Sequence, residues 1–128
     1  MTHQNSKNER EEFKEEFKKR IKQFILDLIQ FIDSLPEDKT CKIISAQLIR
    51  SSTSIGANYC EARAASSKND FINFFNHSLK SANESKFWLE ILIDAKKCDI
   101  LKARKLLKEN FEIANVFASS ILTLKGRK

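Results

Sequence analysis

Large apolar residues recur every three or four positions between residues 9 and 35, which is the spacing of one helix face. The members of this stripe are Phe13, Phe17, Ile21, Phe24, Leu28, Phe31 and Leu35. Pro36 is the only proline, and a proline disfavours the α conformation at the residue before it. We therefore expect the helix to end near Ser34 or Leu35. Residues 1–8 lack the stripe and are expected to form a flexible tail.

Three further segments have the helical period, and we expect helices over residues 40–63, 68–97 and 102–124. Their expected core residues are Ile44, Leu48, Ile55 and Tyr59; then Phe71, Phe74, Phe75, Leu79, Trp88, Leu89 and Leu92; then Leu106, Leu107, Ile113, Ala114, Phe117, Ile121 and Leu124. Four long helices with short links predict an all-α protein, an antiparallel up-down-up-down four-helix bundle. This single domain should span residues 9–125, with a basic C-terminal tail at residues 126–128.

Two of the expected helices also carry a face of small residues. On one of them these are Ser51, Ser54, Ala57 and Asn58, and on the other Ser78, Ser81, Ala82 and Ser85. Two such faces packed together would let the backbones approach closely, and the hydroxyl groups could bond across the seam. We expect this packing, and with it that Ser81→Leu costs well over about 1 kcal/mol by overpacking.

Apolar residues exceed what a simple bundle buries. They point nearly all round the helix within residues 24–32 and again within residues 87–93. Apolar surface outside one core stripe needs another partner, so we expect self-association. The alternative is a wide stripe with a few scattered exposed residues, which is ordinary on a monomer.

Composition excludes several classes of protein. Hydrophobic residues make up 41% of the 128 positions and charged residues 31%, which fits neither a disordered nor a membrane protein. Two glycines and one proline are too few for the turns of a β-sandwich or barrel. The cysteines, Cys41, Cys60 and Cys98, form no CxxC pair, which suits reduced thiols rather than disulfides or zinc. No apolar run reaches membrane-spanning length and the N-terminus is polar, so we expect a cytoplasmic protein.

No catalytic constellation is visible. His77 is the only histidine outside the N-terminal tail, and no Glu-x-x-His pair accompanies it. Nothing in the sequence places a cysteine beside it, and there is no phosphate-binding glycine loop. We expect no enzyme, no metal site, no cofactor and no small-molecule substrate.

The positive charge is uneven along the chain. The formal net charge is +6, and the residues from Lys96 onward carry nine cations against three acids, which accounts for all of it. These cations are Lys96, Lys97, Lys102, Arg104, Lys105, Lys108, Lys125, Arg127 and Lys128. Such a cluster attracts phosphate backbones, so we expect nucleic-acid binding there. The alternatives are a solubilising surface, or contact with an acidic protein or membrane surface.

Three short runs carry a family resemblance. Gln47 to Ala62 reads Q-L-I-R-S-S-T-S-I-G-A-N-Y-C-E-A, and D-F-I-N-F from Asp70 and K-S-A-N-E from Lys80 follow. These runs resemble the "four helix bundle protein" family, which includes proteins encoded in intervening sequences of bacterial large-subunit ribosomal RNA genes. The resemblance covers residues 13–125 in pattern and 46–89 in motif.

The resemblance implies a four-helix bundle that assembles as a ring-like homopentamer. It also implies a fold similar to the accessory proteins of diversity-generating retroelements, which bind nucleic acid and a reverse transcriptase. Nothing catalytic is attached to the motif. Gly56 stands where the family usually has proline and Ala62 where it has glycine, so the kink and C-terminal cap of this helix are expected to differ.

Within the motif, six polar residues share helix faces that we expect to meet. They are Arg50, Ser54, Asn58 and Glu61 on one helix, and Ser81 and Glu84 on the next. We expect a structural or interface network in which a cation such as Arg50 pairs with Glu61 or Glu84. A ligand or RNA contact is the alternative. Together these observations predict a non-enzymatic, homo-oligomeric adaptor for structured RNA or a nucleoprotein. The alternative is a purely structural or protein-binding oligomer.

Overall fold

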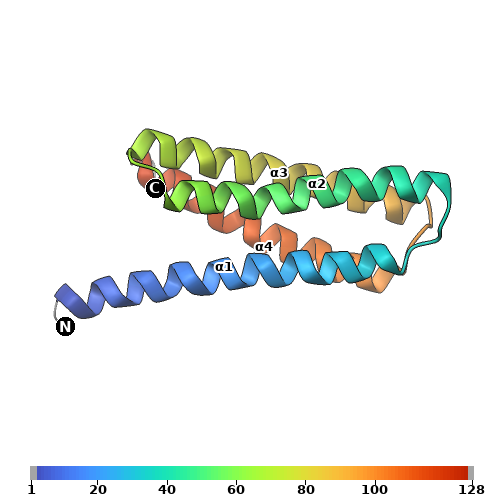
Figure 1. The fold of residues 1–128 in the computed structure, drawn as a ribbon, viewed down its shortest axis with the longest axis horizontal. Helices are drawn as coiled ribbons and strands as arrows, with labels where there is room; N and C mark the ends of the chain where they lie inside the picture. Colours follow the sequence, from blue (N-terminus) through green and yellow to red (C-terminus); the bar gives the residue numbers. More distant parts are fainter. Residues whose placement is uncertain (1–2, 127–128) are drawn as a thin grey trace.

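Four helices and short links make up the computed structural model, which describes residues 3–126. The helices are α1 (His3–Asp33), α2 (Lys39–Arg63), α3 (Lys68–Asp94) and α4 (Ile100–Leu124). Each runs back along the one before it, in the up-down-up-down order expected (Figure 1). Within residues 3–126 there is no strand, and no helix is both long and apolar enough to span a membrane. The expected all-α bundle is confirmed.

Three helix boundaries differ by two residues or more from those expected. α1 begins at His3 rather than Glu9, so the part of the expected tail that the structure describes is helical. Apolar periodicity signals only the buried part of a helix, and residues 5–12 bury almost nothing. α3 ends at Asp94, because Lys96 adopts a left-handed conformation with φ 57° and the Lys97 amide donates back to the Leu92 carbonyl. Asp99 caps α4, which therefore starts at Ile100.

The stripe expected on α1 is buried except at its first member. Phe17, Ile21, Phe24, Leu28, Phe31 and Leu35 are all in the core. Phe13, in contrast, is 62% exposed. The first half of α1 diverges from α4 (Figure 1, blue), so Phe13 stacks on Phe17 of its own helix but is not covered by α4.

The core face of α3 is rotated from the one expected. Its buried residues are Ile72, Phe75, Ser78, Ala82, Ser85, Leu89 and Leu92, whereas Phe71, Phe74, Leu79 and Trp88 are only half-buried. On α4, Leu107, Ala114 and Leu124 are likewise half-buried, and Ala103 and Asn110 lie in the core instead. The small residues turn to the core because α2 and α3 pack closely there. The bulky ones are displaced to its edge.

A seam of serines joins α2 to α3, as the two small faces predicted. Ser51 Oγ lies 2.8 Å from Ser85 Oγ, and Ser78 Oγ donates to the Ile55 carbonyl at 2.9 Å. Ser81 Oγ donates to Ser54 Oγ at 2.9 Å, while Ala57 is exposed and takes no part. These bonds satisfy the buried hydroxyl groups, which would otherwise destabilise the fold. They also explain how α2 tolerates Ser51 and Ser54, which are weaker helix formers than alanine.

Gly56 lets α1 approach α2 closely. A Cβ atom at this position would lie 3.3 Å from Ile21 Cγ2 and 3.3 Å from Ile25 Cδ1. The absence of a side chain therefore serves helix packing, in a helix that continues without interruption to Arg63.

Asn110 is a polar residue in the core, and only half of its amide is satisfied. It is 2% exposed, and its Nδ2 donates to the Ala82 carbonyl at 2.9 Å, while Oδ1 has no partner within the described residues. We expect Asn110→Leu to leave the free energy of unfolding within about 1 kcal/mol of wild type, or to raise it, because an unsatisfied buried oxygen is removed. Urea denaturation measures this. Asn110→Asp is the opposite control and should be clearly less stable, since it would bury a charge. A large loss for Asn110→Leu would contradict the expectation.

Candidate functional site

Cations without acids occupy the start of α4. Residues 100–108 contain four basic residues and no acidic one. These four, Lys102, Arg104, Lys105 and Lys108, are all exposed, while Ala103 and Leu106 between them face the core. Of the four, only Lys102 lies in the first turn of α4, where the helix dipole is positive, and Asp99 caps that end.

Lys97 is engaged in the fold rather than free. Its Nζ lies 2.9 Å from Asp38 Oδ2, and Asp38 also caps α2 by accepting from the Cys41 amide at 2.8 Å. The Cys41 amide and the Lys97 ammonium together lower the pKa of Asp38 to about 2, and Asp38 in turn raises the pKa of Lys97. Lys97 thus ties the link between α3 and α4 to the start of α2.

The nine predicted nucleic-acid-binding cations do not form one surface. Lys96 and the four α4 cations are exposed at one end of the bundle and make no ion pair within residues 3–126. Lys125 lies at the other end of α4, roughly 35 Å away at 1.5 Å per residue. Arg127 and Lys128 lie outside the described residues. We call Lys96, Lys102, Arg104, Lys105 and Lys108 the basic cluster.

A shallow groove of about 640 Å³ runs beside this cluster, between α1 and α4. Lys102, Lys105 and Lys108 line it together with Glu109 and Glu112. Both of these acids are occupied by Arg20, at 2.7 and 3.1 Å. Arg20 thus engages two of the carboxylates near the basic cluster, while Asp27, which also lines the groove, accepts from Gln23.

The polar network predicted on α2 and α3 forms in large part. Arg50 pairs with Glu84 and also donates to Gln47 Oε1 at 3.1 Å. Asn58 Nδ2 donates to Ser54 Oγ at 3.0 Å, and Ser54 Oγ accepts from Ser81. Of the six predicted residues, Glu61 is the exception, because it is exposed and its side chain makes no hydrogen bond or ion pair within the described chain.

Sequence reasoning misses two members of this network. Gln47 lies in the family run with no role assigned to it, and Trp88 belongs to the expected core stripe. The Trp88 indole donates from Nε1 to Glu84 Oε2 at 3.0 Å, and its ring packs on Phe87 with centroids 5.1 Å apart. The signal is the i,i+4 spacing of Glu84 and Trp88, which places a donor over the carboxylate.

A double-mutant cycle on Arg50→Ala and Glu84→Ala should give a coupling free energy of about 0.5–1 kcal/mol. The value is modest because the Arg50 side chain is 57% exposed and the Glu84 side chain 35%. Chemical denaturation of the four proteins measures it. Zero coupling would mean that the pair does not hold α2 to α3. The neighbouring pair Arg50→Ala and Glu61→Ala is the control, for which we expect no coupling.

The cysteines and His77 do not come together as a reactive group. Cys41 is buried, Cys98 half-buried and Cys60 exposed. Burial raises the pKa of both the Cys41 and the Cys98 thiols, which lowers their reactive thiolate fraction. His77 is exposed and its ring is tilted against that of Phe74, with centroids 6.5 Å apart, and no group of three metal-ligating side chains occurs within the described residues.

Comparison with known proteins adds a family and a structural relative. A family model described as "23S rRNA-intervening sequence protein" matches residues 14–119. A crystal structure of a protein of unknown function from the S23 ribosomal protein family of Bacteroides thetaiotaomicron is 34% identical in sequence. The match covers 82% of this chain and 97% of that one, with a TM-score of 0.76. No curated protein matches the chain.

Proposed function

Because this chain belongs to the family of 23S rRNA-intervening sequence proteins, we propose that it is a non-enzymatic, self-associating adaptor that binds structured RNA through its basic cluster. The observation that carries the proposal is the uncompensated charge of that cluster. Five exposed cations have no carboxylate partner within residues 3–126, and four of them lie within the first nine residues of α4. A phosphate backbone bound there would reduce the repulsion between these five cations. Binding would also release the counterions condensed on the nucleic acid, which favours the complex.

Self-association would multiply this field. Among the side chains that the structure describes, nine large hydrophobic ones are exposed: Phe13, Leu26, Ile29, Ile43, Phe87, Ile100, Leu101, Phe111 and Leu122. They occur on all four helices, which supports more than one contact between copies. A ring of five subunits, the number that the family resemblance implies, would present five copies of the basic cluster to one RNA.

A protein partner without RNA is the second candidate function. Leu101, within the basic cluster, is 79% exposed, and Ile100 beside it is 42% exposed. An apolar pair of this kind favours contact with a protein surface. RNA titration separates the two, because only nucleic-acid binding weakens steeply with salt.

The test compares RNA affinity across a salt series for three forms of the full chain. The first is wild type, and the second has Lys102, Arg104, Lys105 and Lys108 replaced by glutamine. The control has glutamine at Lys22, Lys42, Lys80 and Lys86, which are equally exposed and unpaired and change the net charge equally. Fragments of structured ribosomal RNA serve as the probe.

We expect wild type and the control to bind tightly at low salt, with a steep dependence of affinity on salt. For the basic-cluster variant, the slope of log affinity against log salt concentration should become shallower by up to about four units, because each duplex phosphate neutralised contributes roughly 0.9. Absence of binding at low salt would refute the RNA proposal and leave the protein partner. Equal weakening of the two variants would show that net charge matters and the cluster does not.

A further inference from the structure

The solvent-facing side of α4 carries an aromatic ring in line with two cations of the basic cluster. Arg104, Lys108 and Phe111 follow one another at intervals of four and three residues, so their side chains lie on one helix face. All three are exposed, and Phe111 is 62% exposed. Leu106 and Asn110, which alternate with them along the chain, face the core instead. We call Arg104, Lys108 and Phe111 the outer face of α4.

Phe111 takes no part in the packing of aromatic rings in this chain. Its ring forms no aromatic pair within residues 3–126, and it lines neither of the grooves described beside α4. Phe117, six residues further along the same helix, packs in contrast against Phe17, Tyr59 and Phe75. The ring of Phe111 is therefore available to a ligand.

The charge beside this ring is positive. Glu109 and Glu112 are the acids nearest to Phe111 in sequence, and Arg20 of α1 binds both, at 2.7 and 3.1 Å. Arg104 and Lys108 have no carboxylate partner within the described residues. A neutral protein surface placed over the outer face would bury these two cations without partners, which is unfavourable. The outer face instead favours a ligand that brings negative charge and an apolar surface together.

RNA combines these two properties where its bases are unpaired. Within a duplex the bases are stacked on one another, and the major groove of an A-form helix is too narrow for side chains to read. In loops and single strands a base can stack on an aromatic side chain while the phosphates pair with neighbouring cations. The helix rise places Phe111 about 4.5 Å along the axis from Lys108, so one nucleotide can contact both residues.

We propose that the outer face of α4 binds an unpaired segment of RNA, with one base stacked on Phe111 and adjacent phosphates on Arg104 and Lys108. This inference rests on the proposed function and makes it more specific, because the RNA is recognised at a loop or bulge rather than along a duplex. It requires the outer face to stay accessible when copies of the chain assemble.

The experiment measures the affinity of the full chain for two RNAs with the same number of phosphates, a hairpin with a single-stranded loop and a blunt duplex. We expect wild type to bind the hairpin more tightly. Phe111→Ala should bind the hairpin roughly tenfold more weakly, because it loses the stacking of one base, and should bind the duplex as wild type does. The salt dependence of its affinity should equal that of wild type, since no charge is removed.

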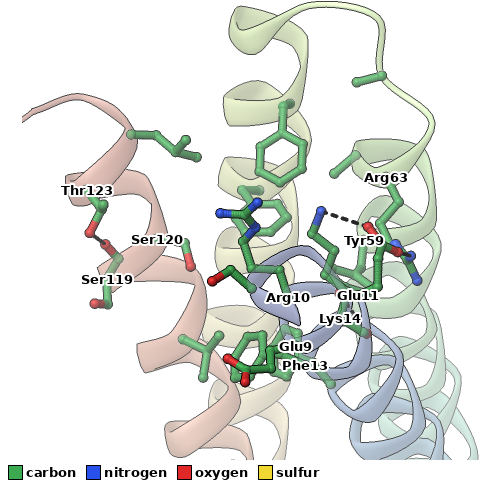
Figure 2. Close-up of a pocket in the computed structure, with 18 residues that line it drawn as sticks. Glu9, Arg10, Glu11, Phe13, Lys14, Tyr59, Arg63, Ser119, Ser120 and Thr123 are labelled. Atoms are coloured by element: carbon green, nitrogen blue, oxygen red, sulfur yellow. Dashed lines mark hydrogen bonds and ion pairs between the residues drawn. The ribbon is translucent and has the colours of Figure 1, made fainter. Parts of the chain in front are cut away.

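Phe13→Ala is the matched control. Phe13 is also 62% exposed, but it lies on α1, where it lines the groove between α1 and α4 (Figure 2). Its removal should leave both affinities unchanged. Phe111→Trp tests the stacking directly, because it should keep the preference for the hairpin and its fluorescence should be quenched on binding. Wild type, whose only tryptophan is Trp88, gives the background signal.

Two results would overturn this inference and leave the proposed function intact. One is equal affinity of wild type for the hairpin and the duplex, and the other is equal affinity of wild type and Phe111→Ala for the hairpin. Failure of wild type to bind either RNA would overturn both proposals. Sedimentation without RNA should give Phe111→Ala the mass of wild type. A smaller mass would place Phe111 between copies of the chain and would also overturn the inference.

Discussion

Phe117→Ala is expected to lower the free energy of unfolding by about 4 kcal/mol, within the range of large-to-small core substitutions. Phe117 is fully buried and lies at the centre of an aromatic cluster. Its ring centroid is 4.9 Å from that of Phe75, 5.3 Å from Phe17 and 6.1 Å from Tyr59. Truncation would remove contacts to three helices at once, and α1 is too firmly packed at Phe17 to fill the space. Urea denaturation followed by circular dichroism measures the loss.

The control for this substitution is Phe111→Ala on the same helix. Phe111 is 62% exposed, so its removal should change stability by no more than about 0.5 kcal/mol. Similar losses at the two positions would contradict the packing described. A small loss at both would mean that the aromatic cluster collapses readily around a cavity.

Ser85→Leu is expected to cost about 3 kcal/mol, at the upper end of overpacking in a well-packed core. Ser85 is fully buried, and its hydroxyl lies 2.8 Å from Ser51 of α2. A leucine side chain would have to push α3 away from α2, and Ser51 would lose its partner across the seam. The Ser81→Leu loss predicted from the sequence should be smaller than this one, because Ser81 is only half-buried.

Asn83→Leu serves as the matched control for the seam, since Asn83 is exposed on the same helix. Its stability should stay within about 0.5 kcal/mol of wild type. Thermal and urea unfolding of both variants can be compared directly. A Ser85→Leu protein as stable as wild type would mean that the two helices can separate without loss, and the seam would then not specify their distance.

The helices and the seam are predictable because both depend on local spacing. A stripe of apolar or small residues at intervals of three and four positions indicates which face of a helix is buried. The pairing of Arg50 with Glu84 follows once the small faces of α2 and α3 meet. The rotation of α3 is not predictable from bulk alone. Phe71 and Trp88 are large, but Ser78 and Ser85 occupy the core because α2 approaches too closely for aromatic rings.

The remaining differences between the predicted and the observed structure depend on tertiary packing. Periodicity places Phe13 on the same face as Phe17, but only the divergence of α1 decides that it is exposed. The charge count groups Lys97 with the neighbouring cations. In the structure, however, Lys97 forms an ion pair with Asp38, the residue that caps the start of α2. The same count includes Lys125, which the length of α4 separates from the others. Each of these depends on where another helix lies, which a single sequence pattern does not record.

The order of the helices has a consequence for how the protein folds. α2 and α3 are joined by a four-residue link and held by the serine seam, so their contacts are local in the chain. Local contacts cost little loop entropy, and we expect this hairpin to form early. Contact between α1 and α4 joins the two ends of the chain and should come last. In native-state hydrogen exchange, the amides of α1 and α4 should therefore open at lower free energy than those of the α2–α3 hairpin.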